Sequence, residues 1–365
     1  MKSDVRNDAR LVHIDLLKCL AIYFVLFFHG TLYINVVTPG MSAMEVLRYL
    51  SRSILSTCVP LFFFINGYLL LSRPMDLKKH LGKILRLGGI TCFWMLFLLL
   101  ALQSHFGEYY TWESFWASCW ELRDGWNNHL WYMGALISLY LIFPILKSAF
   151  DRERKSFYWV AAVMAFVVFG CSTVDLGVTA FRLLARNEYN MLYNNLPVFY
   201  LFNPFTYQSG LALTYFCLGG VTWVLEPRLR EIPARWRNAA AAVGLVTCCG
   251  MLGILGWRIS LYGGITWNHV WFGYNTVFTL GNVLCLYLLS LSWNRDCLPV
   301  RVISTNTLGI YLLHDLIHKH LCPWVTQYPE MRSFSGTVVY AAALLLITLG
   351  ICLVLKKIPL VKHLI

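Results

Sequence analysis

Charged residues are scarce in this chain, and acidic ones are the scarcest. Only 13% of its 365 residues are Asp, Glu, Lys or Arg, against about 25% in a typical soluble domain. Hydrophobic residues make up 58% of the chain, and the mean hydropathy is +0.59. This composition excludes an ordinary soluble domain and predicts an all-α, polytopic integral membrane protein.

The cysteine patterns of a disulfide framework or a zinc site are also missing. The 12 cysteines are scattered in apolar stretches without a C-x-x-C pair, which is typical of small packing residues. Residues 1–10 are polar, and no small-residue cleavage site follows the first apolar run, so we expect that run to remain as a helix. No basic helix or RNA-binding motif is present, so we expect no nucleic-acid partner.

Long apolar runs, by contrast, are abundant. A helix that crosses a bilayer needs about 20 mostly apolar residues, and ten segments meet this requirement. They lie at about 11–33, 47–71, 84–105, 129–147, 157–175, 205–225, 238–258, 270–292, 302–321 and 335–355. No repeat or linker divides them, so we predict one membrane domain over residues 1–365.

Lysine and arginine fall mainly on one side of these spans. With the N-terminus in the cytoplasm, 21 of the 30 basic residues lie in inside segments and five in outside segments. The positive-inside rule therefore predicts that both termini are cytoplasmic. One inside cluster is Arg73, Lys78, Lys79, Lys83 and Arg86. This cluster fits topology alone, or the attraction of an anionic ligand.

Two predicted outside loops, at about 106–128 and 176–204, are long and rich in Trp, Tyr and Asn. Aromatic residues gather at both membrane interfaces, which explains part of this composition. Aromatic platforms for a sugar are the alternative explanation.

The first span carries the ionisable residues Asp15, Lys18 and His29, and such residues inside a membrane are usually functional. Asp15 and Lys18 are spaced to pair. Lys18 and His29 are close to three helical turns apart, about 16 Å along the axis. We therefore predict one polar stripe from the cytoplasmic mouth to His29. The alternative is a histidine that reaches headgroup water at the outer interface.

Further polar groups are predicted at the depth of His29. His314 lies in the outer half of the ninth span, and His129 lies at the outer start of the fourth span with Trp131 and Tyr132. We expect the three histidines to share one level of the membrane. His129 can equally be an interfacial residue at the helix start.

The second span contains Pro60 and the pair Asn66 and Gly67, which we expect to loosen its helix and free backbone groups. Asn66 is predicted in the inner half, nearer to Lys18. In the ninth span, His314 and His318 have a spacing that can hold a metal. No carboxylate or cysteine cluster supports such a site, and Asp315 is expected to point elsewhere, so we predict no metal.

Four stretches resemble signatures of the membrane acyltransferase 3 family, in the expected order. They are HIDLLKCLAIYFVLFFH, VPLFFFINGYLL, HLWYM and ISTNTLGIYLLHDLI. Within that family the chain looks most like stand-alone sugar O-acetyltransferases, such as the one that modifies enterobacterial common antigen. Two departures stand out: Lys18 replaces the family's arginine and lacks its bidentate fork, and Asn66 replaces its serine. We expect no appended hydrolase-like domain.

This resemblance implies transfer of an acyl group, typically acetyl, from cytoplasmic acyl-coenzyme A to a hydroxyl of an envelope glycan or a lipid-linked sugar. It implies a multi-pass protein of the bacterial inner membrane with His29 as the essential catalytic residue. We expect Asp15, Lys18, Arg73 and Arg86 to bind acetyl-coenzyme A, with the pantetheine arm beside Lys18. We expect the acceptor to meet Asn66 and the outer residues His129, Trp131, Tyr132 and His314.

Two chemical routes remain open at His29. Neutral His29 can act as general base on the acceptor hydroxyl, or it can form an acyl-histidine intermediate. His129, Trp131, Tyr132 or His314 can donate to the oxyanion. A polysaccharide or small-molecule transporter is one alternative function, in which the intramembrane His and Asp serve a substrate or proton pathway. A membrane sensing module of a racemase-type system is another.

Overall fold

A computed structural model describes residues 10–30, 40–106, 128–170, 208–263, 273–359 and 361–365, together with 111, 113, 173–174, 177 and 181. All regular secondary structure in these residues is helical, which confirms the all-α prediction. By length and composition, six helical segments can cross a membrane: Val12–His29, Ala43–Leu71, Leu77–Ala101, Trp131–Arg152, Ala234–Trp257 and Phe334–Leu355. The chain is a polytopic membrane protein.

Helices occur within all ten of the predicted ranges. They are α1 (Val12–His29), α2 (Ala43–Leu50), α3 (Arg52–Leu55), α4 (Cys58–Leu71), α5 (Leu77–Phe106), η1 (Asn128–Leu130), α7 (Trp131–Arg152), α8 (Arg154–Ala165), η2 (Phe166–Gly170), α11 (Gln208–Glu231), α12 (Ala234–Gly263), α14 (Val277–Ser290), α15 (Leu298–Thr305), α16 (Thr307–Val325), η4 (Pro329–Arg332), α17 (Phe334–Leu355) and η5 (Val361–His363). The two long aromatic loops lie almost wholly outside the described residues.

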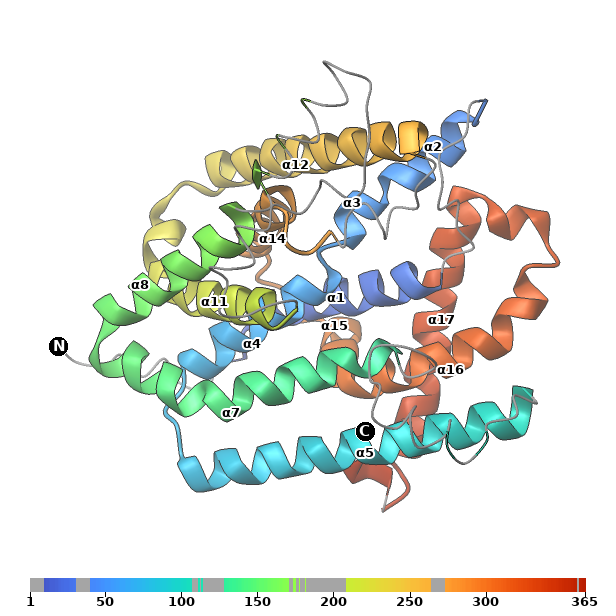
Figure 1. Cartoon of the computed structure of the whole chain (residues 1–365), viewed down its shortest axis with the longest axis horizontal. Helices are drawn as coiled ribbons and strands as arrows, with labels where there is room; N and C mark the ends of the chain where they lie inside the picture. The colour runs from blue at the N-terminus through green and yellow to red at the C-terminus, as the bar shows by residue number, and fades with distance from the viewer. Residues whose placement is uncertain are drawn as a thin grey trace.

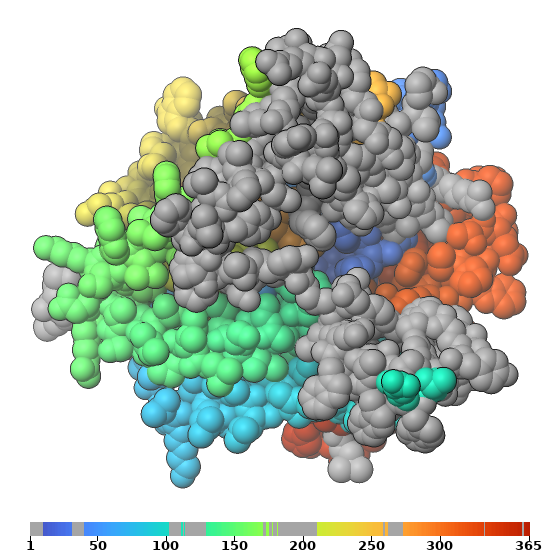
Figure 2. All heavy atoms as spheres, in the orientation of Figure 1, coloured from blue at the N-terminus to red at the C-terminus, as the bar shows by residue number. Residues whose placement is uncertain are grey.

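The bundle has an enclosed centre and two outer helices. In Figure 1, α12 and α5 lie on opposite sides, with α1, α4 and α11 between them. In the segment Ala43–Leu71, 72% of the apolar window is buried, against 22% in α12, so the former is central and the latter peripheral. Leu85 on α5 and Val246 on α12 are among many exposed apolar side chains, as expected for helices that face lipid. Figure 2 shows α7 lying above α5 on the surface.

The centre is held by close contact between α4 and α11. A Cβ added at Gly67 would lie 1.8 Å from the carbonyl oxygen of Phe216, and one added at Gly219 would lie 2.1 Å from that of Phe64. Only glycine allows the two backbones to approach this closely, which is the usual role of small residues between membrane helices.

The prediction that Pro60 and Gly67 loosen the second span is wrong. Helix α4 runs without interruption from Cys58 to Leu71. Pro60 lies in its first turn, where the missing N–H removes no intrahelical hydrogen bond. The span is interrupted earlier, at Ser51 and at 56–57, where α2, α3 and α4 are joined by turns.

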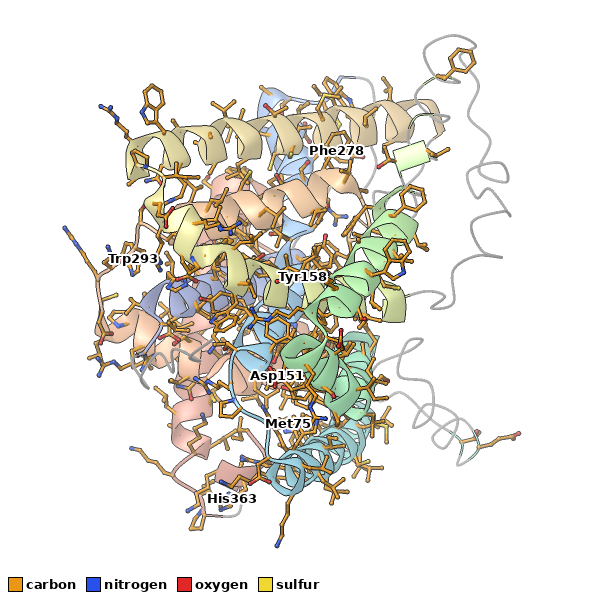
Figure 3. The ribbon with its side chains drawn as sticks, turned by 90° about the vertical axis from the view of Figure 1, so that its left-hand side faces the viewer. Met75, Asp151, Tyr158, Phe278, Trp293 and His363 are labelled. Atoms are coloured by element: carbon orange, nitrogen blue, oxygen red, sulfur yellow. The ribbon has the colours of Figure 1, made fainter. Side chains whose placement is uncertain are left out.

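The predicted inside segments contact one another. The Arg10 Nη2 donates to the Arg301 carbonyl at 3.3 Å, and the Arg86 Nη2 donates to the His363 carbonyl at 3.3 Å. Trp293 and His363 also lie toward the same side of the molecule in Figure 3. The positive-inside rule predicts that this end of the bundle, called the cytoplasmic end below, faces the cytoplasm.

Candidate active site

Three histidines from separate helices form a row at the opposite end of α1. The ring centroids of His29 and His314 are 5.2 Å apart, and those of His314 and His129 are 5.6 Å apart. The predicted common level of these residues is thereby confirmed. His314 is 0% exposed and His129 is 5% exposed, whereas His29 is exposed. The row therefore presents one accessible imidazole that is supported by two buried ones.

Backbone geometry determines the tautomer of His314. Its Nδ1 lies 2.5 Å from the carbonyl oxygen of Tyr311. A carbonyl only accepts hydrogen bonds, so this Nδ1 carries the proton and the Nε2 of the neutral ring carries a lone pair. That Nε2 is buried and has no hydrogen-bond partner in the described part of the chain. Tyr311 also donates its hydroxyl to the carbonyl of His129, which ties α16 to η1.

A carboxylate stands behind His129. The Oδ2 of Asp315 lies 3.6 Å from the Nδ1 of His129 and 2.6 Å from the Nζ of Lys319. Asp315 is expected to point elsewhere on the helix than the pair His314 and His318, and it meets His129. One residue along a helix corresponds to a rotation of about 100°, so while His314 faces His29, Asp315 faces His129 on η1.

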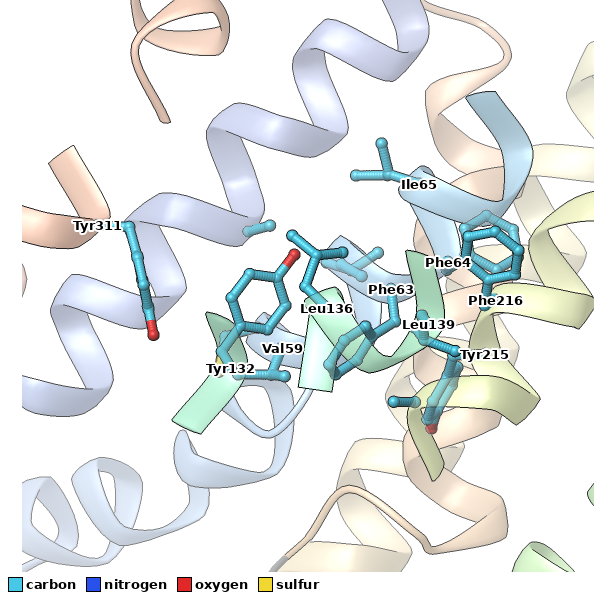
Figure 4. Packing of buried hydrophobic residues seen from close by; sticks show 14 of the residues in the cluster. Val59, Phe63, Phe64, Ile65, Tyr132, Leu136, Leu139, Tyr215, Phe216 and Tyr311 are labelled. Atoms are coloured by element: carbon cyan, nitrogen blue, oxygen red, sulfur yellow. The ribbon is translucent and has the colours of Figure 1, made fainter. Parts of the chain in front are cut away.

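A chain of polar side chains leads from this row toward the cytoplasmic end. The rings of Tyr311 and Tyr132 lie 5.5 Å apart and are neighbours in Figure 4. The Asn66 Nδ2 donates to the Tyr132 hydroxyl at 3.3 Å, and the Tyr140 hydroxyl donates to the Asn66 Oδ1 at 3.2 Å. The Nζ of Lys83 lies 4.9 Å above the Tyr140 ring. This chain connects the basic segment at the start of α5 with the histidines.

The polar stripe predicted on α1 itself is not continuous. Ile22 and Val25 occupy the same helix face between Lys18 and His29, and they are 0% and 2% exposed. Their apolar side chains pack against neighbouring helices and leave no polar group between the two ends. The polar connection runs on α4 and α7 instead.

The remaining predicted donor-binding residues lie at the cytoplasmic end. Asp15 lies 3.9 Å from the Nζ of Lys18, as the spacing predicted, but its Oδ2 also accepts from the Nε of Arg10 at 2.5 Å. Arg73 and Arg86 are exposed. Lys18, Arg10 and Arg73 are near enough to interact electrostatically, and the Asp15 carboxylate offsets part of their charge.

One predicted neighbour of the histidines, Trp131, and one pair of suitable spacing, His314 and His318, are not brought together. Trp131 stacks on Tyr274, with ring centroids 6.3 Å apart, and no contact in the described residues joins it to the histidines. His318 pairs through its Nδ1 with the Tyr340 hydroxyl at 2.9 Å, whereas His314 faces the row. In the described part of the chain, no group of three His, Cys, Asp or Glu side chains can hold a metal.

Sequence reasoning missed Tyr311, Asp315 and Tyr140. A signal was present for the first two, because residues at i, i+3 and i+4 share a helix face and Tyr311, His314 and Asp315 have this spacing. No signal in the sequence indicated that Tyr140 would meet Asn66.

These features define a polytopic membrane protein with a histidine site enclosed among its helices. The profile of the acyltransferase domain, Acyl_transf_3, matches residues 11–357, and the chain belongs to this acyltransferase 3 family. It is therefore a membrane acyltransferase with an acyl donor and an acceptor. Searches of curated proteins and of solved structures found no match.

Proposed function

We propose that this acyltransferase moves an acetyl group from cytoplasmic acetyl-coenzyme A to a hydroxyl of a cell-envelope glycan or a lipid-linked sugar in the bacterial inner membrane. The observation that carries the proposal is the row of three imidazoles, of which only His29 is exposed. The resemblance to stand-alone sugar O-acetyltransferases favours acetyl as the group and a sugar as the acceptor.

In the proposed reaction, neutral His29 removes the proton from the acceptor hydroxyl while its oxygen attacks the thioester carbonyl. The carbon–sulfur bond then breaks, and His29 returns the proton to the departing thiolate of coenzyme A. The competing route begins with attack by His29 itself and passes through an acyl-imidazole. In both routes His29 must begin with one unprotonated ring nitrogen.

His314 is proposed to position that nitrogen. Its own Nδ1–H is engaged by Tyr311, and its Nε2 has no partner in the described residues, so we propose that this Nε2 accepts the single N–H of neutral His29 during the reaction. Such a hydrogen bond would leave the second nitrogen of His29 free for the hydroxyl. Asp315 and Lys319 hold His129 against the other side of His314.

The donor is proposed to enter along the chain from Lys83 through Tyr140 and Asn66 to Tyr132. Lys83, Arg73 and Arg86 attract the anionic nucleotide of coenzyme A. The amides of the pantetheine arm would then form hydrogen bonds with the Asn66 side chain and with the hydroxyls of Tyr132 and Tyr140. Each of these side chains can donate and accept hydrogen bonds.

A test uses the purified protein in nanodiscs with radiolabelled acetyl-coenzyme A and an envelope glycan fraction. We expect acceptor-dependent release of the coenzyme A thiol, with label appearing in the glycan. His29→Ala should abolish both signals at unchanged protein yield. A transporter would bind or move the glycan without releasing the thiol, and that result would refute the proposal.

A further inference from the structure

A polar cavity lies at the other end of α1 from the histidine row. It has a volume of about 410 Å³ and is lined by Arg10, Leu11, Val12, His13, Glu226, Arg230, Trp293 and Asn294. His13 precedes His29 by 16 residues, which is about 24 Å along the helix axis. Trp293 marks this edge of the molecule in Figure 3. The cavity is therefore separate from the proposed catalytic site.

The carboxylate at the base of this cavity is already satisfied by the protein. Glu226 is 1% exposed. It accepts from the Tyr68 hydroxyl, from the Tyr287 hydroxyl at 3.0 Å and from the Arg230 Nε at 2.7 Å. Its acceptor oxygens are occupied and its charge is paired with Arg230, so Glu226 does not oppose the binding of an anion as a free carboxylate would.

The other polar groups of the lining are donors. The side chains of Arg10 and Arg230 are 34% and 36% exposed. Each is paired with a carboxylate, Asp15 or Glu226, and also donates to a backbone carbonyl, but each guanidinium keeps further N–H groups without a partner in the described residues. His13 is 5% exposed, and its Nε2 lies 3.6 Å from Glu226, beyond hydrogen-bond distance. Neither this Nε2 nor the buried indole N–H of Trp293 has a hydrogen-bond partner in the described residues. The cavity thus combines two partly exposed guanidinium groups with the unpartnered indole N–H of Trp293, and the His13 Nε2 lies beside Glu226.

We propose that this cavity binds a phosphate ester. Guanidinium groups pair strongly with phosphate oxygens, and the indole N–H of Trp293 supplies a further donor. A neighbouring cavity of about 300 Å³ shares Arg230 and Asn294 and is also lined by Arg237. It offers room for the group that carries the phosphate. The ester can come from a soluble metabolite or from an anionic phospholipid headgroup of the cytoplasmic leaflet.

Two binding measurements distinguish these sources. The first titrates adenosine 3′,5′-bisphosphate by calorimetry, at constant ionic strength, into the full chain in phosphatidylcholine nanodiscs. The second measures by native mass spectrometry whether the chain retains phosphatidylglycerol from mixed vesicles. Saturable binding in either arm supports the proposal, and the responding arm identifies the source. An absence of saturable binding in both arms overturns it, whatever the variants do.

Variants then locate the ligand. We expect the Arg10→Gln and Trp293→Phe double variant to weaken binding at least tenfold. Arg235→Gln removes the same charge from an exposed position outside both cavities and should leave binding unchanged. The assignment would be overturned if Arg235→Gln weakened binding as much as the double variant does. It would also be overturned if Lys83→Ala weakened binding and the double variant did not. These readouts measure binding, so they are independent of whether acyl transfer occurs.

Discussion

The imidazole of His29 lies 5.2 Å from that of His314, although the two residues lie on different helices far apart in the sequence. His29 ends α1 and His314 lies within α16. Because the Nδ1 of His314 is engaged by a backbone carbonyl, its orientation is set by its own helix. The contact therefore allows a rigid, buried ring to orient an accessible one.

Replacement of His314 by Phe should separate positioning from binding. The ring volume is largely kept, but the acceptor nitrogen is lost. We expect kcat to fall by about 10²-fold, the lower end of what a positioned acid–base group contributes, with little change in the KM for the donor. His318→Phe is the matched control, because His318 lies one turn along and pairs with Tyr340 instead. Equal losses in the two variants would contradict the proposed role.

Asp315→Asn tests the carboxylate behind His129. The side chain keeps its shape and loses its charge, so we expect kcat to fall by about tenfold while the donor KM stays near that of the unmodified protein. The acid limb of the kcat profile should move to lower pH, because a nearby carboxylate favours the protonated form of an imidazole. Kinetics from pH 5 to 8 measure the shift. Asp296→Asn, at an exposed cytoplasmic position, should leave the profile unchanged.

Lys83→Ala tests the proposed donor route. Removing this cation from above Tyr140 should raise the KM for acetyl-coenzyme A by about tenfold and leave kcat nearly unchanged, as expected when ground-state binding alone is lost. Lys79→Ala is the control, since the Lys79 side chain is 86% exposed on the same helix. A larger effect of Lys18→Ala than of Lys83→Ala would instead favour a route along α1.

Gly67→Ala tests the packing of α4 against α11. The new methyl group would collide with the Phe216 carbonyl, and overpacking of this kind costs about 1–3 kcal/mol or more. We expect a lower midpoint of thermal unfolding in detergent. Gly89→Ala on α5 meets no atom within 4 Å and should be neutral or stabilising by about 0.5–1 kcal/mol. A Gly67→Ala midpoint at or above that of Gly89→Ala would be inconsistent with this packing.

The depth of the site could be predicted from the sequence. Alternating spans cross the membrane in opposite directions, so the distance of a residue from its end of a span gives its level. This reasoning placed His29, His129 and His314 together, and the structure agrees.

Lateral neighbours could not be predicted in the same way. Helical periodicity shows which face a residue occupies but not which helix that face meets. The pairing of Asn66 with Tyr132 and Tyr140 therefore emerged only in the fold, and so did the convergence of Tyr68 and Tyr287 on Glu226. The expected stripe on α1 failed for a different reason, which the sequence itself contains: the apolar Ile22 and Val25 lie on the same face between Lys18 and His29.

The most direct test of the account is single-turnover transfer by His29→Ala in nanodiscs loaded with saturating acetyl-coenzyme A and glycan. We predict that the variant binds the donor with unchanged affinity, measured by calorimetry, and transfers acetyl at least about 10²-fold more slowly. Transfer at the rate of the unmodified protein would contradict the account.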